Sequence, residues 1–457
     1  MEGLEISEIK MSFLKKENRT FRIDSNFFIK KSLSVDNKIK SMNHFYISEE
    51  NIVSGPFGSS LKSDAYLNAG VPFIRIENIK NGFSISTDNL IYISEFDNSR
   101  LKSSQLFEDD LILSKVGNTI GYYARVDSNI KNCNISENNI GIKLNSYNRD
   151  VKHYIMTFLN SKYGNILTLR RISGNAQPKL NVFDISEIPI PQFNEEFYKK
   201  ISDRIIKADE LKQHSKSLYS QAEDLLLGEL GLKDWQPKNT LYTTKKFSDF
   251  AQSGRLDAEY YQPKYDDLFE KLSCLNCKRL GKIVSIKKSF DPGSDAYQET
   301  GIPFIRVSDI SKDGIEKTEL HLSPIDFDIP ELKPKKDTIL FSKDGSIGIA
   351  YKVQSDLNVF TSGALLHLVT TDSSILPDYL TLVLNSVVVK LQAERDSNGA
   401  IIQHWKPSDI ENVIIPILPE QIQKKIASLI QQSFECRAQS KQLLEDAKRM
   451  VEAEIEK

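Results

Sequence analysis

The segment SDAYLNAGVPFIRIENI at residues 63–79 returns as SDAYQETGIPFIRVSDI at residues 294–310, and the two copies align without a gap. A repeat of this length indicates a duplicated architecture. Outside it, the motif Arg22-Ile-Asp24 matches Arg255-Leu-Asp257, and residues 154–222 align with residues 379–447 at a constant offset. The chain therefore contains an internal duplication, with the same motifs in the same order in both halves.

Each half predicts a globular domain followed by a long helix. Short apolar runs such as VPFIRI and DLILS, set among Gly, Asn, Ser and aromatic residues, predict strands. Prolines precede both helices, with Asn194 as the N-cap of the first, and glycines end the first. We expect an α+β fold in which two pseudo-repeated globular α/β domains are joined by two long antiparallel helices forming a coiled coil. The expected boundaries are domain 1 at 1–190, helix 1 at 191–232, a linker at 233–244, domain 2 at 245–416 and helix 2 at 417–457.

Both helices show a seven-residue pattern in which small residues recur at one seam position. We expect mutual pairing, because small residues at the same position in both copies permit close backbone approach. The alternative is that each helix packs only on its own domain. The residues assigned to pairing are Ala208, Leu211, Ser215, Leu218 and Ala222 in the first helix, and Ser433, Cys436, Ser440, Leu443 and Ala447 in the second.

Composition excludes several classes of protein. A chain of 457 residues is longer than a single hydrophobic core usually accommodates, so we expect at least two domains. With 40% hydrophobic and 27% charged residues, its composition is that of a folded globular protein. The net charge of -2 differs from the strongly positive charge of most nucleic-acid-binding domains, so only local basic patches could indicate such binding. No run approaches about 18 apolar residues, the start lacks a signal-peptide core, and the four cysteines are scattered, so we expect a cytoplasmic protein.

Motifs for catalysis are missing from the sequence. There is no GxxxxGK[ST], GxGxxG, HExxH or GxSxG, and the six histidines show no ligand spacing. The CxxC at Cys274 and Cys277 lacks a second ligand pair, which favours two incidental thiols over zinc. We expect neither a catalytic nor a metal site, although scattered nuclease carboxylates would leave no motif.

Several polar loops carry side chains suited to phosphates and base edges. Glycine permits close backbone approach, Lys and Ser bind phosphate oxygens, and Arg, Asn and Gln read guanine and adenine. Ordinary solvent-exposed turns are the alternative for each loop. The candidate DNA contacts are Ser59, Ser60, Lys62, Lys115, Asn118, Arg170, Arg171, Asn175 and Gln177 in the first half, and Lys287, Lys288, Ser289, Lys343, Ser346, Arg395, Asn398, Gln403 and His404 in the second.

Two other repeated features favour a structural role. Arg75 and Arg306 each follow a predicted strand, and we expect them to pair with a carboxylate rather than with a base. The aromatic pairs at 27–28 and 260–261 are predicted to anchor the start of each domain in its core.

Together these motifs resemble the specificity subunit of a type I restriction-modification system. The resemblance covers the chain from Phe21 onward and rests on GPFGSSLKSDAY, the paired GVPFIRIENI and GIPFIRVSDI, SKVGNTIG and SKDGSIG, SGNAQPKLNVFDISEIPIP, and the proline-containing entry to the second helix. The approach to the glycine loop differs between the copies, so base-reading residues cannot be carried from one half to the other.

The resemblance implies two target-recognition domains separated by conserved helices that act as a spacer. It implies double-stranded DNA and two methyltransferase subunits as partners, with restriction and translocase subunits completing the complex. It also implies no cofactor on this chain, since S-adenosylmethionine is bound by the methyltransferase. The alternatives are a specificity subunit for a type II-style fused nuclease-methyltransferase or an orphan methyltransferase, a self-sufficient metal-dependent nuclease, and a helical scaffold without DNA contact.

Overall fold

The apolar runs predicted as strands form two main sheets in each half of the chain. The computed structural model describes residues 8–12, 14, 22–56, 61–80, 83–174, 177–238, 240, 242–327, 329–397 and 403–457. It divides into unit 1, Met1–Leu211 with Ala438–Lys457, and unit 2, Lys212–Arg437. Each unit thus takes part of both long helices, which is why the units do not follow the linear boundary expected at residue 190.

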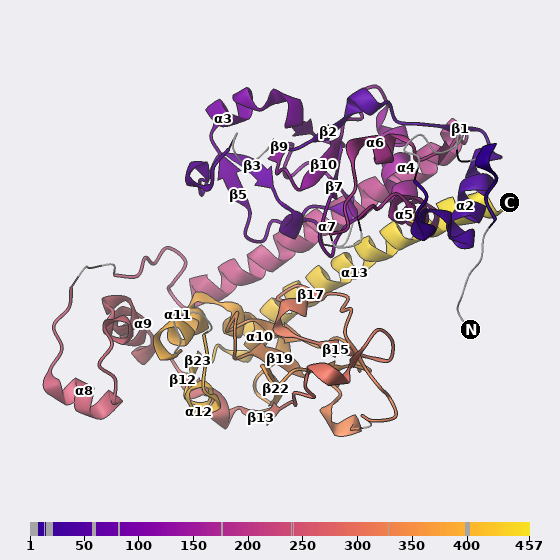
Figure 1. Cartoon of the computed structure of the whole chain (residues 1–457). Coiled ribbons are helices and arrows are strands. Elements are labelled where there is room, and N and C mark those ends of the chain that lie inside the picture. The colour runs from indigo at the N-terminus through magenta and orange to yellow at the C-terminus, as the bar shows by residue number, and fades with distance from the viewer. Residues whose placement is uncertain are drawn as a thin grey trace. The chain divides into compact units, whose positions relative to one another are not determined.

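Unit 1 contains a five-stranded sheet in the order β2-β10-β7-β8-β4 and a four-stranded sheet in the order β5-β3-β9-β6. Its strands are β1 (His44–Phe45), β2 (Ile52–Ser54), β3 (Val71–Ile74), β4 (Phe83–Ser84), β5 (Ile91–Ile93), β6 (Leu106–Phe107), β7 (Leu111–Ser114), β8 (Tyr123–Arg125), β9 (Asn132–Ile135), β10 (Asn139–Ile142) and β11 (Ile190–Pro191). Its helices are α2 (Lys30–Lys40), α3 (Glu95–Arg100), α4 (Arg149–Leu159), α5 (Lys162–Arg170), α6 (Val182–Ser186) and the first part of α7 (Glu195–Glu229) (Figure 1).

Unit 2 repeats the plan with sheets in the orders β13-β22-β19-β20 and β14-β18-β15-β21. Its strands are β12 (Cys277–Arg279), β13 (Val284–Lys288), β14 (Tyr297–Gln298), β15 (Ile302–Ile305), β16 (Ile310–Ser311), β17 (Gly314–Ile315), β18 (His321–Leu322), β19 (Ile339–Ser342), β20 (Ala350–Lys352), β21 (Phe360–Thr361), β22 (Leu365–Thr370) and β23 (Ile414–Pro416). Its helices are α8 (Phe247–Ser253), α9 (Pro263–Ser273), α10 (Pro377–Asn385), α11 (Val387–Asp396), α12 (Pro407–Glu411) and the first part of α13 (Glu420–Glu456).

Matching hydrogen bonds show that the two units share one frame. The buried hydroxyl of Tyr154 donates to the carbonyl of Pro191 at 2.6 Å, and that of Tyr379 donates to Pro416 at 2.7 Å. The amide of Asn160 donates to Tyr123 O at 2.9 Å, as its counterpart on α10 does to β20. Each unit also has an equivalent parallel strand pair, β3 with β9 in unit 1 and β15 with β21 in unit 2, and unit 1 has a second one, β4 with β8. The duplication predicted from the sequence is confirmed.

The two long helices lie within the ranges expected for them. The side chain of Asn194 accepts from the amide of Phe197 at 2.9 Å and caps the start of α7. Gly231 has a φ of 66°, a conformation that favours glycine, and ends the helix.

At the small seam residues, serine side chains of α13 reach the main chain of α7. In unit 1 the hydroxyl of Ser440 donates to the carbonyl of Ala208 at 2.7 Å. In unit 2 the hydroxyl of Ser433 donates to the carbonyl of Ser215 at 2.8 Å and lies 2.9 Å from its hydroxyl. The later residue of α7, Ser215, pairs with the earlier residue of α13, Ser433. The two helices therefore run antiparallel. A larger side chain at these positions would prevent a hydroxyl from reaching the opposite main chain.

The residues at one predicted seam position are buried, whereas most of those at the other are not. Ala208, Ser215, Ala222, Ser433, Ser440 and Ala447 are all buried. At the second position only Leu218 is buried, whereas Leu211, Cys436 and Leu443 are half-buried. The second set of buried residues lies one position later, at Ile205, Tyr219, Leu226, Ile430 and Val451. These residues belong to the domain cores, so the helices bury a face against their own domains as well as a seam against each other.

A buried cation fastens the domain of unit 1 to α7. The guanidinium of Arg125, at the end of β8, is 2% exposed and pairs with Asp109 at 2.6 Å and with Asp209 on α7. Burial alone would raise the pKa of Asp109, but the hydrogen bond from His153 and the charge of Arg125 hold that pKa well below its usual range. Removing one partner of a buried ion pair typically costs about 3 to 5 kcal/mol.

Unit 2 has a lysine in the same place. The ammonium of Lys352, at the end of β20, lies 3.2 Å from Asp337 and 3.1 Å from Asp378. The amide of Gln431 on α13 donates to Asp378 at 3.2 Å. The same docking principle therefore uses different side chains in the two copies.

Replacing Ser440 or Ala208 with Leu should destabilise the helix pair, because the seam has no room for the added carbons. We expect a loss of about 1 to 3 kcal/mol in the free energy of unfolding, measured by urea denaturation followed by far-UV circular dichroism. Gln439→Leu, at an exposed position on α13, is the matched control. Equal unfolding midpoints for the seam variants and the control would contradict the close-packed seam.

Candidate nucleic-acid interface

In unit 2 several predicted contacts leave the same end of the main sheet. Lys288, the last residue of β13, is paired with Leu366 near the start of β22, and Ser342, the last residue of β19, is paired with Leu365. Lys343 follows directly. Because neighbouring antiparallel strands start and stop at a common edge, Lys287, Lys288 and Lys343 gather at one end of this sheet.

Unit 1 has the equivalent edge. Ser54 at the end of β2 pairs with Ile140, and Ser114 at the end of β7 pairs with Asn139. The glycine loop that leads to Lys62 and the loop that begins at Lys115 both leave from this edge. Ser59 and Ser60 lie outside the described residues.

A short bridge brings a further loop to each edge. In unit 2, Asp344 forms an antiparallel bridge with His404, and the amide of Trp405 donates to Lys343 O at 2.8 Å. In unit 1, Val116 bridges Lys179 in the same way, and the amide of Leu180 donates to Lys115 O at 3.0 Å. Loops that are far apart in the sequence therefore meet, in a matching way, in both copies.

Most of the predicted contacts in these loops face solvent. Lys343 is an exception, because its side chain is 13% exposed and is paired with Asp344. Lys115 is half-buried, and Asn175 and Asn398 lie outside the described residues. The exposed residues are Lys62, Asn118, Gln177, Lys287, Lys288, Ser346, Gln403 and His404.

Two predicted base readers in unit 1 are instead structural. Arg170 is 4% exposed, pairs with Asp36 at 2.9 Å and stacks over the ring of Phe27 at 4.2 Å. Arg171 is 6% exposed and donates to Glu187 O at 2.7 Å. Both guanidinium groups are engaged inside the domain, so neither is available to contact DNA.

Two predictions in unit 2 are corrected for the same reason. Arg395 stacks on the rings of Phe269 and Tyr260, at 4.3 and 5.1 Å, and bonds Asp396 at 2.7 Å. Ser289 is buried and its hydroxyl donates to Thr361 O at 2.5 Å.

The two structural expectations for repeated residues are confirmed. Arg75 pairs with Glu77, and Arg306 lies 3.8 Å from Asp309. The domain-start aromatics also lie in or against the core: Phe27, Phe28 and Tyr261 are buried and Tyr260 is half-buried.

Of the four residues in the two bridges, sequence reasoning identified only His404 as a candidate contact. Lys179 and Asp344 were not among the predicted contacts, although the constant offset between the halves aligns Lys179 with His404. Searching the aligned halves for positions where the residues differ, rather than where they are identical, would have found the pair Lys179 and His404.

A buried histidine lies in the strand beside the lysines of unit 2. His367 is paired with Lys287 across β22 and β13, and its Nε2 lies 2.8 Å from the hydroxyl of Thr361. Burial, and then the positive charge of Lys287, lower the pKa of His367 to about 4. The histidine is therefore neutral at physiological pH and supports the edge without adding charge to it.

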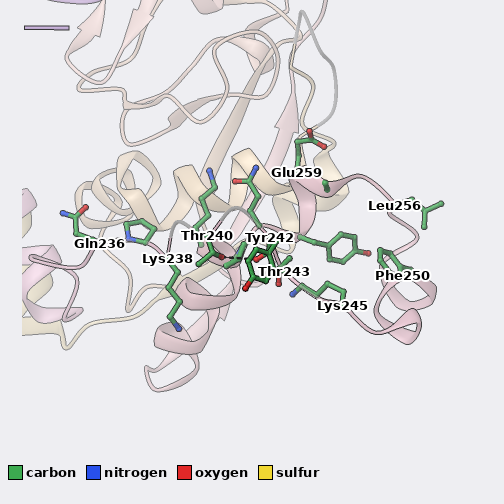
Figure 2. Close-up of a pocket in the computed structure, with 15 residues that line it drawn as sticks. Gln236, Lys238, Thr240, Tyr242, Thr243, Lys245, Phe250, Leu256 and Glu259 are labelled. Atoms are coloured by element: carbon green, nitrogen blue, oxygen red, sulfur yellow. Dashed lines mark hydrogen bonds between the residues drawn. The ribbon is translucent and has the colours of Figure 1, made fainter.

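A hollow in unit 2 lies away from the sheet edges. A cavity of about 910 Å³ is formed by the linker and the start of the second domain, with Lys238, Tyr242, Lys245 and Glu259 among its lining side chains (Figure 2). None of its lining residues belongs to the two sheet edges. Among the described residues, no group of three or more His, Cys, Asp or Glu side chains is arranged to hold a metal ion, and no helix is long and apolar enough to cross a membrane.

The fold and the two polar edges define a duplicated α+β protein with one candidate nucleic-acid-reading edge in each unit. Residues 276–449 match the family model described as "Type I restriction modification DNA specificity domain". The resemblance drawn from the motifs is therefore confirmed.

Similar proteins carry the same description. The chain is 27% identical over 402 residues to the type I restriction enzyme MjaIX specificity subunit of Methanocaldococcus jannaschii, covering 84% of each chain. It is 27% identical over 145 residues to the EcoBI specificity subunit of Escherichia coli, covering 31% of this chain and 30% of that one. Among solved structures, the type I S subunit from M. genitalium aligns over 91% of this chain and 95% of its own, with 15% identity and a TM-score of 0.39.

The buried state of His367 predicts a pH-dependent stability for unit 2. In the unfolded chain a histidine takes up a proton near pH 6.5, whereas in the folded unit it does so near pH 4. Stability should be complete above pH 6.5 and fall by about 3 kcal/mol as the pH drops towards 4. Both tryptophans lie in unit 2, so urea denaturation followed by their fluorescence at pH 7.5 and 5.0 measures the part of this loss, about 2 kcal/mol, that falls between these two pH values.

His367→Asn should flatten this dependence, because the titrating group is removed. Val369→Asn, at an exposed position two residues along the same strand, should retain it. The assignment fails if the wild type and His367→Asn lose the same stability between the two pH values.

Proposed function

We propose that this chain is the DNA-sequence-recognition subunit of a type I restriction-modification complex. The observation that carries the proposal is the repeated polar sheet edge: one backbone frame occurs in both units, and it presents different side chains in each. Side chains on a fixed frame are what direct readout of base edges requires. The match of residues 276–449 to the DNA specificity family supports it.

Because the sheet edges of the two units expose different side chains, the target should consist of two different half-sites. Unit 1 offers Lys62, Asn118 and Gln177, whereas unit 2 offers Lys287, Lys288 and His404. Each unit would read one short half-site, and the base pairs between the half-sites would remain unread.

A duplicated chain can present one partner with two equivalent binding surfaces. On this basis the subunit binds two methyltransferase subunits, and restriction and translocase subunits join the same assembly in the cytoplasm. S-adenosylmethionine binds to the methyltransferase, and this chain contributes recognition and scaffolding rather than catalysis.

The near-neutral charge fits this division of labour. Nonspecific DNA affinity comes mostly from phosphate neutralisation, which requires many basic side chains. With a net charge of -2, this chain supplies base readout and a few phosphate contacts, and the partners supply the remainder.

Exchanging residues 21–190 for the equivalent domain of another specificity subunit should change one half-site and leave the other intact. The incoming domain must keep residues that pack on α7 and α13, because both helices belong to the core of unit 1. Sequencing methylated bases in a host that carries the partner genes, with and without this chain, measures the outcome. A palindromic or continuous recognition sequence, or a change in both half-sites, would contradict the proposal.

Charge reversal at Lys287 and Lys288 should weaken DNA binding without preventing assembly. If both lysines contact phosphates, the slope of log K against log salt should fall by about two, because roughly one counterion is released per contact. The measurement is a salt titration of DNA binding by the assembled complex, with assembly checked by size-exclusion chromatography. Lys282→Glu with Lys390→Glu, two exposed lysines away from this edge, is the control. Loss of assembly would place Lys287 and Lys288 at a protein interface instead.

A further inference from the structure

The bridge at each sheet edge holds two loops in the same conformation in both units. Val116 with Lys179, and Asp344 with His404, occupy equivalent antiparallel bridges. The glycines that follow, Gly117 and Gly345, have φ angles of 84° and 72°, a conformation that a side chain would strain. The backbone geometry is therefore conserved within the chain where the side chains differ.

A buried neighbour fixes the direction of the outer residue in each bridge. Leu180 is 0% exposed and Trp405 is 1% exposed, and the Trp405 ring packs against Phe341 with centroids 5.8 Å apart. Successive residues of an extended segment point to opposite sides. Lys179 and His404 consequently point outward, and both are exposed.

The chemistry at this position differs between the units. In unit 2, Asp344 lies 2.9 Å from Nδ1 of His404 and also pairs with Lys343. A carboxylate only accepts hydrogen bonds, so Nδ1 carries the proton and donates to Asp344. In the neutral ring, Nε2 is then an acceptor, on a side chain that is 63% exposed. In unit 1 the bridge partner is Val116, which has no carboxylate, and Lys179 can only donate.

We infer that the outer residue of this bridge, Lys179 in unit 1 and His404 in unit 2, reads a base edge and makes the two half-sites differ. Asp344 is a positioning residue that sets the tautomer of His404. This inference rests on the proposed function and assigns a residue pair to its specificity.

The polarity of each side chain predicts the kind of base that it reads. A lysine donor matches O6 and N7 of guanine in the major groove. A histidine Nε2 acceptor matches the amino group of adenine or cytosine. One position of each half-site should therefore show guanine for unit 1 and an amino-bearing base for unit 2.

The test gives unit 2 the bridge pair of unit 1. In the complex with its methyltransferase partner, the double variant Asp344→Val with His404→Lys should shift one position of one half-site towards guanine. Affinity for the original duplex should fall by about 5- to 150-fold, as expected for one base contact. The readouts are the methylated motif in the host and the binding of the assembled complex to duplexes with each base at each position.

Two further variants separate reading from folding. Asp344→Asn keeps an oxygen acceptor for His404 and should retain most of the discrimination, whereas Asp344→Val alone should lose it. Lys390→His, an exposed position on α11, is the matched control and should leave both half-sites unchanged. If methylation is lost completely, binding to the duplexes with each base at each position decides the outcome. Loss of base discrimination at one position supports the inference, whereas an equal loss of affinity for all sequences overturns it.

The result also distinguishes this inference from the proposed function. An unchanged motif and affinity in the double variant, with a wild-type motif that depends on this chain, overturns only the assignment of the bridge pair. A wild-type complex whose methylation does not depend on this chain overturns the proposed function itself.

Discussion

The rest of the structure depends on the close approach of α7 and α13, which the hydroxyls of Ser440 and Ser433 mark by reaching main-chain carbonyls of the opposite helix. Only small residues allow this approach, and it places apolar faces of both helices against each domain. The core of unit 1 includes Ile205 and Val451, and that of unit 2 includes Leu226 and Ile430. Neither core is complete without parts of both helices.

Buried residues and exposed residues alternate within the same loops. Trp405 and Leu180 point inward and fix the frame, while their neighbours face solvent. A substitution at an outward position changes the chemistry of the edge and leaves the packing beneath it intact. Buried cations link each domain to a long helix: Arg125 pairs with Asp209 on α7, and Lys352 pairs with Asp378, which accepts a hydrogen bond from Gln431 on α13.

The duplication, the two long helices and the small seam residues could be predicted, because they leave a repeat or a seven-residue period in the sequence. Prediction failed for Arg170 and Arg395, because the rings and carboxylates that engage them are brought near only by folding. The second seam position shifted by one residue since each helix also serves a domain core, a demand that heptad spacing does not reveal. Asp344 escaped notice because its importance comes from His404, sixty residues later, and a bridge between loops leaves no local pattern.

Unit 2 is one continuous segment, Lys212–Arg437, inserted between the two parts of unit 1. During synthesis all of unit 2 is made before residues 438–457, which supply Ala447, Val451 and Ile455 to the core of unit 1. The domain that is translated first is therefore completed last. A ribosome that stops within codons 438–457 would release a chain with a complete second unit and an incomplete first one, exposing apolar surface to chaperones and proteases.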